Sequence, residues 1–523
     1  MQQQLTIRLL PSEAQSDDTI KDYISNHLSI NKKLITGLTY IKRSIDARGR
    51  QPGIQLKVNV FIDEPYTMRE RQNLRLEKVS RDAKKILIAG AGPAGLFAAL
   101  KLIEEGIQPI ILERGKNVRD RRRDLAKLNK EGIINPDSNY CFGEGGAGTY
   151  SDGKLYTRST KRGDVNRILS ILVQFGAEES ILYDAHPHIG TNKLPQIITS
   201  IREKIISCGG EFFFEKKITD FILSHNKLTG VITSDDHKFD ADALILATGH
   251  SARDIFTLLH KKKILIEPKP FALGVRVEHP QQLIDTIQYH CTARDELLPP
   301  ASYSLVQQVQ GRGVFSFCMC PGGIIAPAST SPEELVVNGW SPSKRNNPFA
   351  NSGIVVAIRD QDIAPLINKY GPLAAMEFQR SVEHMAFKAG GGNFVAPAQR
   401  LEDFTRKKKS TDLPPCSYLP GIRSTVLHDI IPSYIYNSLR DAFFHFGKKM
   451  KGYFTNEAVV VATESRTSSP VKIPRDPKTL EHPQIRGLYP CGEGAGYAGG
   501  IVSAAMDGEK IAAVAAERIK SKA

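Results

Sequence analysis

The chain has 523 residues, of which 41% are hydrophobic, and its 70 Lys and Arg outnumber its 56 Asp and Glu to give a net charge of +14. A chain of this length can bury several hydrophobic cores, and we expect about three domains. It contains no run of roughly 18 apolar residues that could span a bilayer and no secretory signal pattern at its N-terminus, so we expect a cytoplasmic protein. Seven cysteines without CxxC pairs or zinc spacing predict reduced thiols and no metal site.

The first 84 residues predict a separate α/β module with a helical linker. The expected elements are strands near residues 5–10, 36–45 and 55–62, a helix near 19–28 and a helical linker over 66–85. Lys42, Arg43, Arg48 and Arg50 crowd the turn between the last two strands. Binding of an acidic partner or nucleic acid is therefore an alternative to packing of this module on the rest of the protein.

Residues 86–114 contain, in order, an apolar strand, a glycine turn, a helix, a second apolar strand and an acid, which together are typical of a dinucleotide-binding unit. Gly90 permits a tight turn, Gly92 lets the backbone approach a pyrophosphate, and Gly95 allows the helix to pack on the sheet. The helix N-terminus favours phosphate, and Glu113 can accept hydrogen bonds from ribose hydroxyls. The candidate cofactor-binding residues of this unit are Gly90, Gly92, Pro93, Ala94, Gly95, Glu113 and Arg114.

A second glycine-rich segment, residues 142–155, has the sequence FGEGGAGTYSDGKL. This composition does not suit a buried strand, so we expect Gly146 and Gly148 to let the backbone approach a cofactor; a surface turn is the alternative. A helix near 194–208, a strand at 212–214 and a small meander over 218–239 should follow, with Ile218 as a further cofactor contact.

Two distant segments indicate which dinucleotide is bound. Residues 241–249 predict a strand ending in Ala247, Thr248 and Gly249, and residues 487–508 predict a short strand, a glycine-rich loop and a helix that starts near Ile501. Together with the first glycine turn they resemble the FAD-binding domain of two-dinucleotide-fold flavoproteins. The resemblance implies non-covalent FAD held by Gly492, Glu493, Gly500 and Ile501, with Glu493 standing where the pattern usually has Asp.

The chain as a whole resembles a family of bacterial and plastid FAD-dependent dehydrogenases (NAD(FAD)-utilising dehydrogenase-like proteins) whose physiological reaction is generally unassigned. The closer resemblance lies in residues 142–155, in FSFCMCPGG from Phe315 and in TESRTSSPVKIPRD from Thr463. It implies an α/β fold: a glutathione-reductase-like flavin domain with an inserted α+β substrate domain. The expected boundaries are 1–84 for the N-terminal module, 85–267 and 481–523 for the two parts of the flavin domain, and 268–480 for the insertion.

For the chemistry, we expect hydride transfer through flavin N5 to or from an unidentified small molecule. The candidate catalytic residues are Lys154, Arg466, Cys318 and Cys320. Arg466 could bind a substrate anion or form an ion pair with Glu464 or Asp476. Cys318 and Cys320 could be buried structural thiols or could face the substrate in a redox role; residues two apart on a strand do not ordinarily form a disulfide.

No second dinucleotide fingerprint lies between residues 267 and 480, and Gly390 to Gly392 indicate a loop. NAD(P)H, as a possible donor, would therefore bind transiently in the cleft that the substrate uses. The candidate groups around that cleft are Lys154, Tyr156, His188, Arg466 and Tyr497. His186 and His188 have no third ligand at a convincing spacing, so pocket lining or plain surface is favoured over a metal site.

The excess positive charge is scattered over clusters such as residues 119–123, 261–263 and 406–409, which we expect to be solvated faces. Without an aromatic ladder between them, a nucleic-acid partner is not expected. Two alternatives to the oxidoreductase remain open: a flavin-containing RNA-modifying or nucleic-acid-binding protein that uses the basic N-terminal module, and a redox-sensing scaffold without turnover. The sequence does not indicate the oligomeric state.

Overall fold

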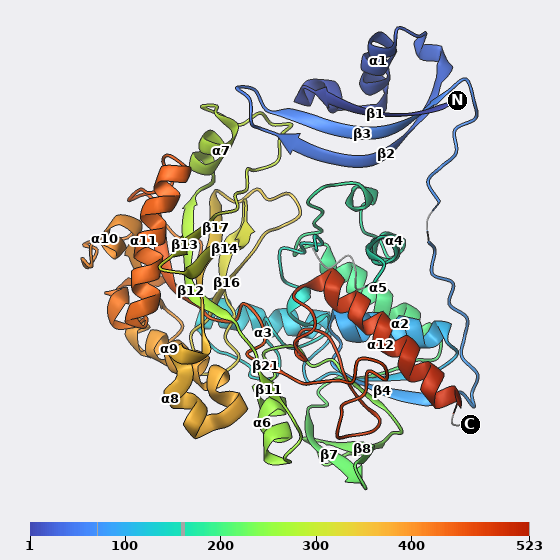
Figure 1. Ribbon diagram of the computed structural model, residues 1–523, viewed down its shortest axis with the longest axis vertical. Helices are drawn as coiled ribbons and strands as arrows, with labels where there is room; N and C mark the ends of the chain where they lie inside the picture. Colours follow the sequence, from blue (N-terminus) through green and yellow to red (C-terminus); the bar gives the residue numbers. More distant parts are fainter. Residues whose placement is uncertain (71, 158–162, 522–523) are drawn as a thin grey trace.

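The structure, a computed structural model, describes residues 1–70, 72–157 and 163–521. Three sheets, each with its own hydrophobic core or cores, organise the chain: an N-terminal antiparallel sheet, a five-stranded parallel sheet and a large mixed sheet (Figure 1). The predicted α/β class is confirmed, because all four strand pairs of the five-stranded sheet are parallel and helices pack on it.

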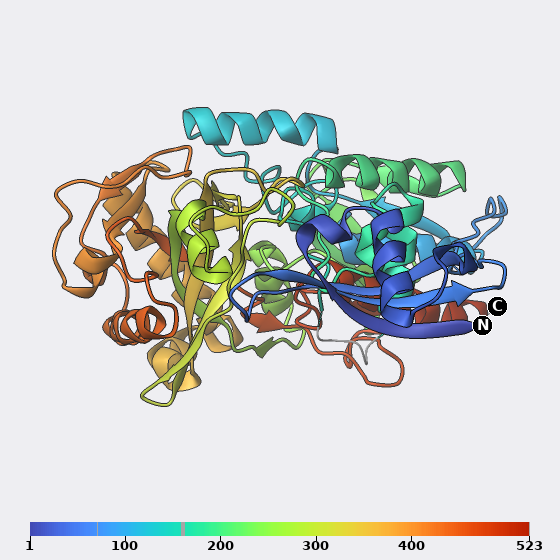
Figure 2. The same ribbon diagram turned by 90° about the horizontal axis from the view of Figure 1, so that it is seen from above.

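The N-terminal module is a three-stranded antiparallel sheet covered on one face by a helix. Its elements are β1 (Gln2–Leu9), α1 (Asp17–Leu28), β2 (Ile35–Asp46) and β3 (Gly53–Ile62), with strand order β1-β3-β2. Ile20 and Ile24 of α1 are buried against the inward face of the sheet, where Val58 and Val60 of β3 are fully buried. Seen from above, the module covers one side of the molecule (Figure 2).

The predicted helical linker is wrong: the described residues between β3 and β4 contain no helix. Apart from a short turn in which Ala83 N donates to the carbonyl oxygen of Ser80, the backbone bonds of the described residues in this segment go to the body of the protein. Leu74 N donates to Gln174 Oε1 at 2.8 Å, and Val79 N donates to the carbonyl oxygen of Cys208 at 3.0 Å. Leu74 is also buried in the core beside the parallel sheet. Because these outside partners satisfy the backbone, the segment runs extended along the surface (Figure 1).

The parallel sheet has the order β22-β10-β4-β5-β6. Its strands are β4 (Lys85–Ala89), β5 (Gln108–Leu112), β6 (Glu211–Phe213), β10 (Leu244–Leu246) and β22 (Leu488–Pro490). All residues of β10 and β22 are buried, as are four of the five in β4, which is the pattern of strands covered on both faces. β22, the last strand of the chain, therefore lies at one edge of the sheet in which β4 is the first strand along the chain.

Helices pack on one face of this sheet and a small meander packs on the other. The helices are α2 (Pro93–Glu104), α4 (Val165–Gln174), α5 (Leu194–Ser207) and α12 (Ile501–Ser521). A further helix, α3 (Val118–Glu131), follows β5 in the chain and precedes α4. The other face carries β7 (Ile218–Ser224), β8 (Lys227–Thr233), β9 (Lys238–Asp240) and α6 (Arg253–Lys261). The helices α2 and α12 approach so closely that a Cβ on Gly508 would clash with the carbonyl oxygen of Ala94.

The inserted part forms a seven-stranded sheet of order β13-β14-β17-β12-β20-β18-β19, antiparallel except for the pair β18 and β19. Its strands are β12 (Ala272–Pro280), β13 (Val306–Val309), β14 (Arg312–Cys320), β17 (Phe349–Ala357), β18 (Ala396–Arg400), β19 (Ile422–Ser424) and β20 (Val459–Glu464). The accompanying hairpin is β15 (Ile324–Pro327) with β16 (Val337–Trp340), and the helices are α7 (Gln281–Tyr289), α8 (Asp360–Tyr370), α9 (Ala374–Gly390), α10 (Leu401–Thr405) and α11 (Ser433–Lys449).

The two ends of the insertion are paired: β11 (Glu267–Pro268) forms an antiparallel bridge with β21 (Val471–Lys472). The domain boundaries remain proposals, and side-chain packing suggests where the chain returns. Val471 and Ile473, which precede the expected boundary at 480, are buried in a core of the parallel sheet. Among the described residues, no helix has the length and apolar character needed to cross a membrane.

Candidate functional site

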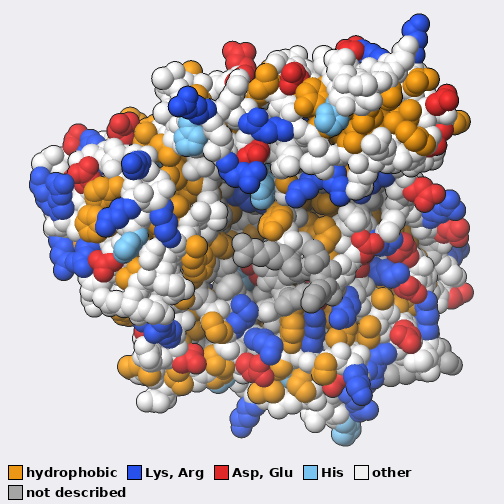
Figure 3. Space-filling model, turned by 45° about the horizontal axis from the view of Figure 1, so that its top comes forward, with side chains coloured by type: hydrophobic (Ala, Val, Ile, Leu, Met, Phe, Trp, Pro, Cys, Tyr) orange, Lys and Arg blue, Asp and Glu red, His pale blue; other side chains and the backbone are white. Residues whose placement is uncertain are grey.

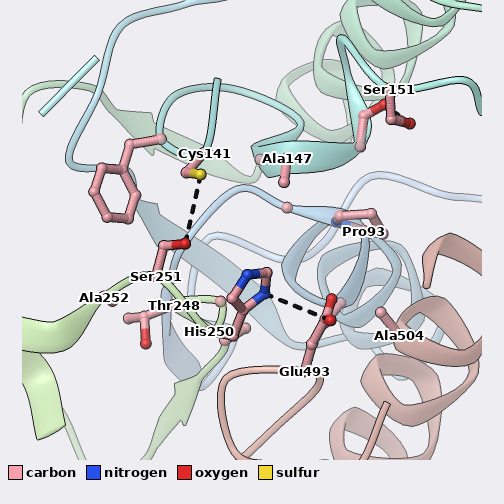
Figure 4. A pocket seen from close by; sticks show the side chains of 18 of the residues that line it. Pro93, Cys141, Ala147, Ser151, Thr248, His250, Ser251, Ala252, Glu493 and Ala504 are labelled. Carbon is pink, nitrogen blue, oxygen red and sulfur yellow. Dashed lines mark hydrogen bonds and ion pairs between the residues drawn. The ribbon is translucent and has the colours of Figure 1, made fainter. Parts of the chain in front are cut away.

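A cavity of about 400 Å³ opens at the carboxyl ends of β4, β5 and β10 and extends to the inserted sheet. Crevices at this edge of a parallel sheet are where such folds bind ligands. Residues from both the first and the last parts of the chain surround it, and Figure 4 shows Pro93 and Ala504 facing the same space from two helices. Nineteen of the candidate residues named from the sequence line it: Gly90, Gly92, Pro93, Ala94, Glu113, Arg114, Gly146, Gly148, Lys154, Tyr156, Ile218, Ala247, Thr248, Gly249, Cys318, Arg466, Glu493, Gly500 and Ile501.

The glycine turn at the start of α2 leaves open space beside its backbone. Gly92 is the N-cap of α2 with φ of −76°, a conformation open to any residue, and a Cβ there would touch only Gly146 Cα at 3.9 Å. The first N–H groups of α2 have no acceptor within the helix. Gly95 does not line the cavity; a Cβ at Gly95 would clash with the carbonyl oxygen of Gly90, so its absence allows the helix to sit on the turn.

Glu113 lies at the end of β5 with its carboxylate almost completely buried at 4% exposure. Its Oε1 accepts hydrogen bonds from the backbone N–H groups of Gly115 and Gly143, and its Oε2 accepts one from Ala91, all at 2.9 Å. Since a carboxylate oxygen has two lone pairs, Oε2 keeps one site for a ribose hydroxyl. Glu113 therefore fixes two glycine segments and still faces the cavity.

Arg121 holds the second glycine segment from inside the protein. This guanidinium is fully buried and donates to the carbonyl oxygens of Asn139 at 2.8 Å, Glu144 at 2.7 Å and Gly146 at 2.8 Å. The expectation that residues 119–123 form a solvated face is wrong for Arg121, because α3 directs this side chain inward while Arg123 is 70% exposed. The segment is also held against the α2 turn, where Gly145 N donates to the carbonyl oxygen of Ala91.

On the opposite side, the loop before α12 and the end of β10 close the cavity. Glu493 Oε1 lies 3.5 Å from His250 Nδ1, and these side chains point toward one another in Figure 4. Gly499 and Gly500, which precede the α12 N-terminus, have nothing within 4 Å of an added Cβ. Gly492 does not line the cavity: its N–H donates to Asp507 Oδ2 at 2.8 Å, which ties the loop to α12.

At the inserted sheet, the cavity reaches Lys154, Asp152 and Cys318. Lys154 Nζ lies 3.4 Å from Asp152 Oδ2 and also donates to the carbonyl oxygen of Met319. Although burial opposes ionisation, the charges of Lys154 and Arg345 lower the pKa of Asp152 to about 2. Burial opposes the charge of Lys154 as well, yet Cys318, Cys320 and Asp152 together raise the pKa of Lys154 above its ordinary value. Asp152 and Lys154, at this end of the cavity, are therefore both charged at neutral pH.

Arg466 lines the cavity but its guanidinium is already engaged. It donates to Glu383 Oε2 at 3.0 Å, to Glu334 Oε2 at 2.7 Å and to Thr330 Oγ1 at 2.7 Å. The predicted ion-pair partners Glu464 and Asp476 are wrong, because Glu464 pairs with Arg276 instead and Asp476 accepts backbone N–H groups. Four bonds from a side chain that is 5% exposed favour a structural role for Arg466 over anion binding.

Of the other cleft candidates, the described structure places only Tyr156 on the cavity. His188 lies behind it with Nε2 3.1 Å from the carbonyl oxygen of Ser343, and the Tyr497 ring packs under the Arg475 guanidinium at 3.7 Å. Cys320 is fully buried and does not line the cavity.

Sequence reasoning missed several lining residues. They include Cys141, Lys216, Lys217, His250, Ser251, Asp254 and Phe317. Cys141 Sγ and Ser251 Oγ are 3.4 Å apart across the cavity wall (Figure 4). His250 and Ser251 directly follow Gly249, so their position after a buried strand could have indicated them. Cys141 lies on a loop and Phe317 on β14, and only the tertiary fold brings these two segments to the cavity.

FAD fits the chemistry of this cavity. The first N–H groups of two helices have no acceptor within their own helix and suit a pyrophosphate. The open positions beside Gly92, Gly249 and Gly500 would be filled by a Cβ on any other residue. The carboxylates of Glu113 and Glu493 lie at separate places along the wall and suit hydroxyl groups.

Comparisons with known proteins agree with a flavoprotein family. Residues 270–467 match the family described as FAD-dependent protein, C-terminal domain-like, and residues 1–61 match a domain of unknown function, DUF8436. The chain is 39% identical to a protein of Clostridium beijerinckii described as "Uncharacterized protein", over 97% of this chain and 98% of that one.

Two solved structures are distantly similar in arrangement. The flavin-dependent brominase Bmp2 shares 13% identity at a TM-score of 0.37, covering 83% of this chain and 79% of Bmp2. A geranylgeranyl bacteriochlorophyll reductase-like protein from Thermoplasma acidophilum shares 13% identity at a TM-score of 0.36, covering 84% and 80%. These scores are too low to support conclusions about the site.

Proposed function

Because the chain belongs to the same family as the Clostridium beijerinckii protein and contains the C-terminal domain of FAD-dependent proteins, we propose that it is an FAD-dependent oxidoreductase acting on a small molecule. The single observation that carries this proposal is the cavity itself. It joins a glycine turn and two helix N-termini to an ionised cluster that lies against a second sheet.

The residues divide into those that would hold FAD and those that would meet the substrate. Gly92 and the α2 N-terminus would receive the pyrophosphate, Glu113 the adenosine ribose, and Glu493 the ribityl chain. Bound FAD would supply hydride transfer at its ring. The N-terminus of α12 would stabilise negative charge on that ring, because its first N–H groups carry the positive end of the helix dipole.

The substrate side is the inserted sheet. Lys154 and Asp152 present fixed charges there, and Phe317 of β14 contributes an apolar wall. Half-buried Arg345, paired with Asp152 at 3.0 Å, holds that carboxylate in place. A polar substrate with an anionic or carbonyl oxygen would be oriented by Lys154.

We also propose that a nicotinamide donor enters through this same cavity. Among the residues that the structure describes, only one sheet has the all-parallel, dinucleotide-type arrangement, and its crevice would be filled by FAD. NADH or NADPH would then compete with the organic substrate. Anaerobic titration with each nucleotide, followed by flavin absorbance, measures this directly.

Replacement of Gly92 tests FAD binding. Gly92→Val should strongly reduce the flavin that copurifies with the protein, because the branched side chain would occupy the space that the pyrophosphate needs. The backbone at Gly92 accepts any residue and its surroundings leave room, so the fold should remain. Gly49→Val in the exposed N-terminal hairpin, where a Cβ would meet only Arg8 Nη2 at 3.9 Å, is the matched control.

Flavin content is measured by absorbance after denaturation, and folding by circular dichroism. Full flavin occupancy in Gly92→Val, or wild-type protein that binds no FAD when it is supplied, would refute the assignment of this cavity.

A further inference from the structure

Two thiols share one ammonium group where the cavity meets the inserted sheet. Cys318 lines the cavity, and Cys320 is completely buried behind it. Lys154 Nζ lies 3.8 Å from Cys318 Sγ and 3.7 Å from Cys320 Sγ. The Arg276 guanidinium lies 3.6 Å from Cys320 Sγ and donates to the carbonyl oxygen of Cys318 at 2.8 Å. The Cys318 thiol thus faces the cavity, and the Cys320 thiol lies in the interior behind it.

The backbone between these cysteines departs from a regular strand. Pairing with β17 passes from Phe317 opposite Gly353 to Cys320 opposite Asn351, which inserts one extra residue in β14. Cys318 has φ of +47°, a left-handed conformation that is uncommon for residues other than glycine.

This irregularity changes what the two cysteines can do. In a regular strand, Cα atoms two residues apart are about 6.6 Å apart, near the upper limit for a disulfide. Here the ladder is interrupted between Phe317 and Cys320, so it does not fix that spacing. Cys320 Sγ lies 3.2 Å from the carbonyl oxygen of Cys318, which shows that its side chain turns back toward Cys318.

The surrounding charges favour a thiolate. Lys154, Arg276 and Arg345 are three cations, and the carboxylates of Asp152 and Glu464 are two anions, which leaves one positive charge. Burial raises the pKa of Glu464 to about 7, and protonation of Glu464 increases the excess further. Arg276 is fully buried and Lys154 and Arg345 are partly buried, and an excess positive charge in such surroundings is unfavourable unless it is paired.

Cys318 is the group placed to provide the missing negative charge. A hydrogen bond from the Cys320 thiol, with the charges of Lys154 and Arg276, lowers the pKa of Cys318 well below its ordinary value. The pKa of Cys320 changes in the other direction: burial raises it well above its ordinary value. The pair therefore consists of one thiolate and one thiol, as in a redox-active dithiol.

We propose that Cys318 and Cys320 form a dithiol–disulfide pair that exchanges two electrons with the flavin of the proposed function. In oxidation, the Cys318 thiolate and the Cys320 thiol form one S–S bond and release two electrons and the Cys320 proton. The oxidised flavin takes up both electrons and that proton. In the reverse direction the S–S bond breaks, Cys318 leaves as thiolate and Cys320 regains the proton.

The first experiment counts thiols. The purified protein is equilibrated without oxygen in mixtures of reduced and oxidised glutathione, quenched in acid and alkylated under denaturing conditions. We expect the oxidised protein to lose two of its seven alkylation sites together, and peptide mass spectrometry should place the loss of two hydrogens in the peptide with Cys318 and Cys320. Cys318→Ser and Cys320→Ser should each abolish this paired loss, while Cys291→Ser, in another part of the insertion, should retain it.

The second experiment measures Cys318 reactivity. Its alkylation rate in the folded protein should change little between about pH 6 and 8, because the thiolate is already formed. In Lys154→Met the rate should fall at neutral pH and rise about tenfold per pH unit, as for an ordinary thiol of pKa about 8.5. Thermal midpoints of the variants show whether the fold is retained.

The third measurement links the pair to the flavin. Under anaerobic conditions, reduced protein with bound FAD should lose two thiols for each flavin that is bleached, and Cys320→Ser should lose this coupling. Seven free thiols in every glutathione mixture, or an ordinary pH dependence of Cys318 alkylation in the wild type, would overturn the pair. Absence of FAD from a protein that still forms the disulfide would overturn the proposed function and this coupling, but not the disulfide.

Discussion

Glu383 is the carboxylate on which the contact between the inserted part and the parallel-sheet part depends. This fully buried residue of α9 accepts hydrogen bonds from Arg466 and from Arg253 of α6, with Arg253 Nη2 2.9 Å from Glu383 Oε1. Glu334 is the second carboxylate of the cluster and pairs with both arginines. We predict that Glu383→Gln, which keeps the shape but removes the charge, destabilises this contact strongly because two buried arginines then share one carboxylate.

The magnitude follows from the pKa of Glu383. Burial alone would raise that pKa, but Arg253 and Arg466 lower it from 4.5 to about 2. A difference of about 2.5 pKa units corresponds to roughly 3 kcal/mol of stability at neutral pH, close to the 3–5 kcal/mol typical of breaking one partner out of a buried ion pair. For a cooperative unit of 150–250 residues this lowers the thermal midpoint by about 6–12 °C.

The assay is thermal unfolding followed by circular dichroism, with Glu377→Gln as the control. Glu377 is on the same helix and pairs with the half-exposed Arg380, so its replacement should change stability by less than about 1 kcal/mol. Because the folded pKa of Glu383 lies below the unfolded one, its contribution is complete above pH 4.5 and is lost as the pH falls toward 2. The difference in thermal midpoint between the wild type and Glu383→Gln should therefore become smaller as the pH falls from 4.5 toward 2. Equal midpoints for the two variants at pH 7 would refute the reasoning.

Two other perturbations test how the site and the module are held. Arg121→Met should lower the thermal midpoint and the flavin content together, because at least three carbonyl oxygens in and just before the glycine segment lose a buried donor at about 1–3 kcal/mol each. Arg123→Met, exposed on the same helix, should change neither. Arg43→Ala removes a bidentate but solvent-exposed pair with Asp184, so unfolding should change by less than about 1 kcal/mol and proteolysis of the linker at residues 64–84 should not accelerate. Flavin retained in Arg121→Met, or rapid cleavage of the linker in Arg43→Ala, would contradict these expectations.

The charge of the chain has a more limited meaning than its total suggests. Lys and Arg side chains lie in several separate groups on the face drawn in Figure 3, with Asp and Glu among them. Arg43 of the basic hairpin binds Asp184, and its backbone exchanges hydrogen bonds with Tyr183 and Ala185. The hairpin thus packs on the rest of the protein, and binding of nucleic acid there stays the alternative that the sequence left open.

Local sequence was sufficient for the elements of the parallel sheet. Glycine turns, apolar strands and helix starts obey short-range rules, so the first strand, α2, the strand before Gly249 and the start of α12 at Ile501 could be read directly. The linker was misjudged because a mixed-charge segment suits a helix or an extended strand equally well. The partners that decide between them, Gln174 and Cys208, lie about 100 residues or more along the chain.

Only the tertiary structure decided which partners the buried charged side chains have. Arg121, Arg276 and Arg466 look alike in sequence, but their surroundings give them a carbonyl cage, an ion pair beside two thiols and a cluster between two parts of the protein. A guanidinium has no local preference for any of these, because its energy depends on which carboxylates and carbonyls share its low-dielectric surroundings. The sequence by itself determined where a dinucleotide would meet the backbone; the fold alone determined which ionised side chains meet it there.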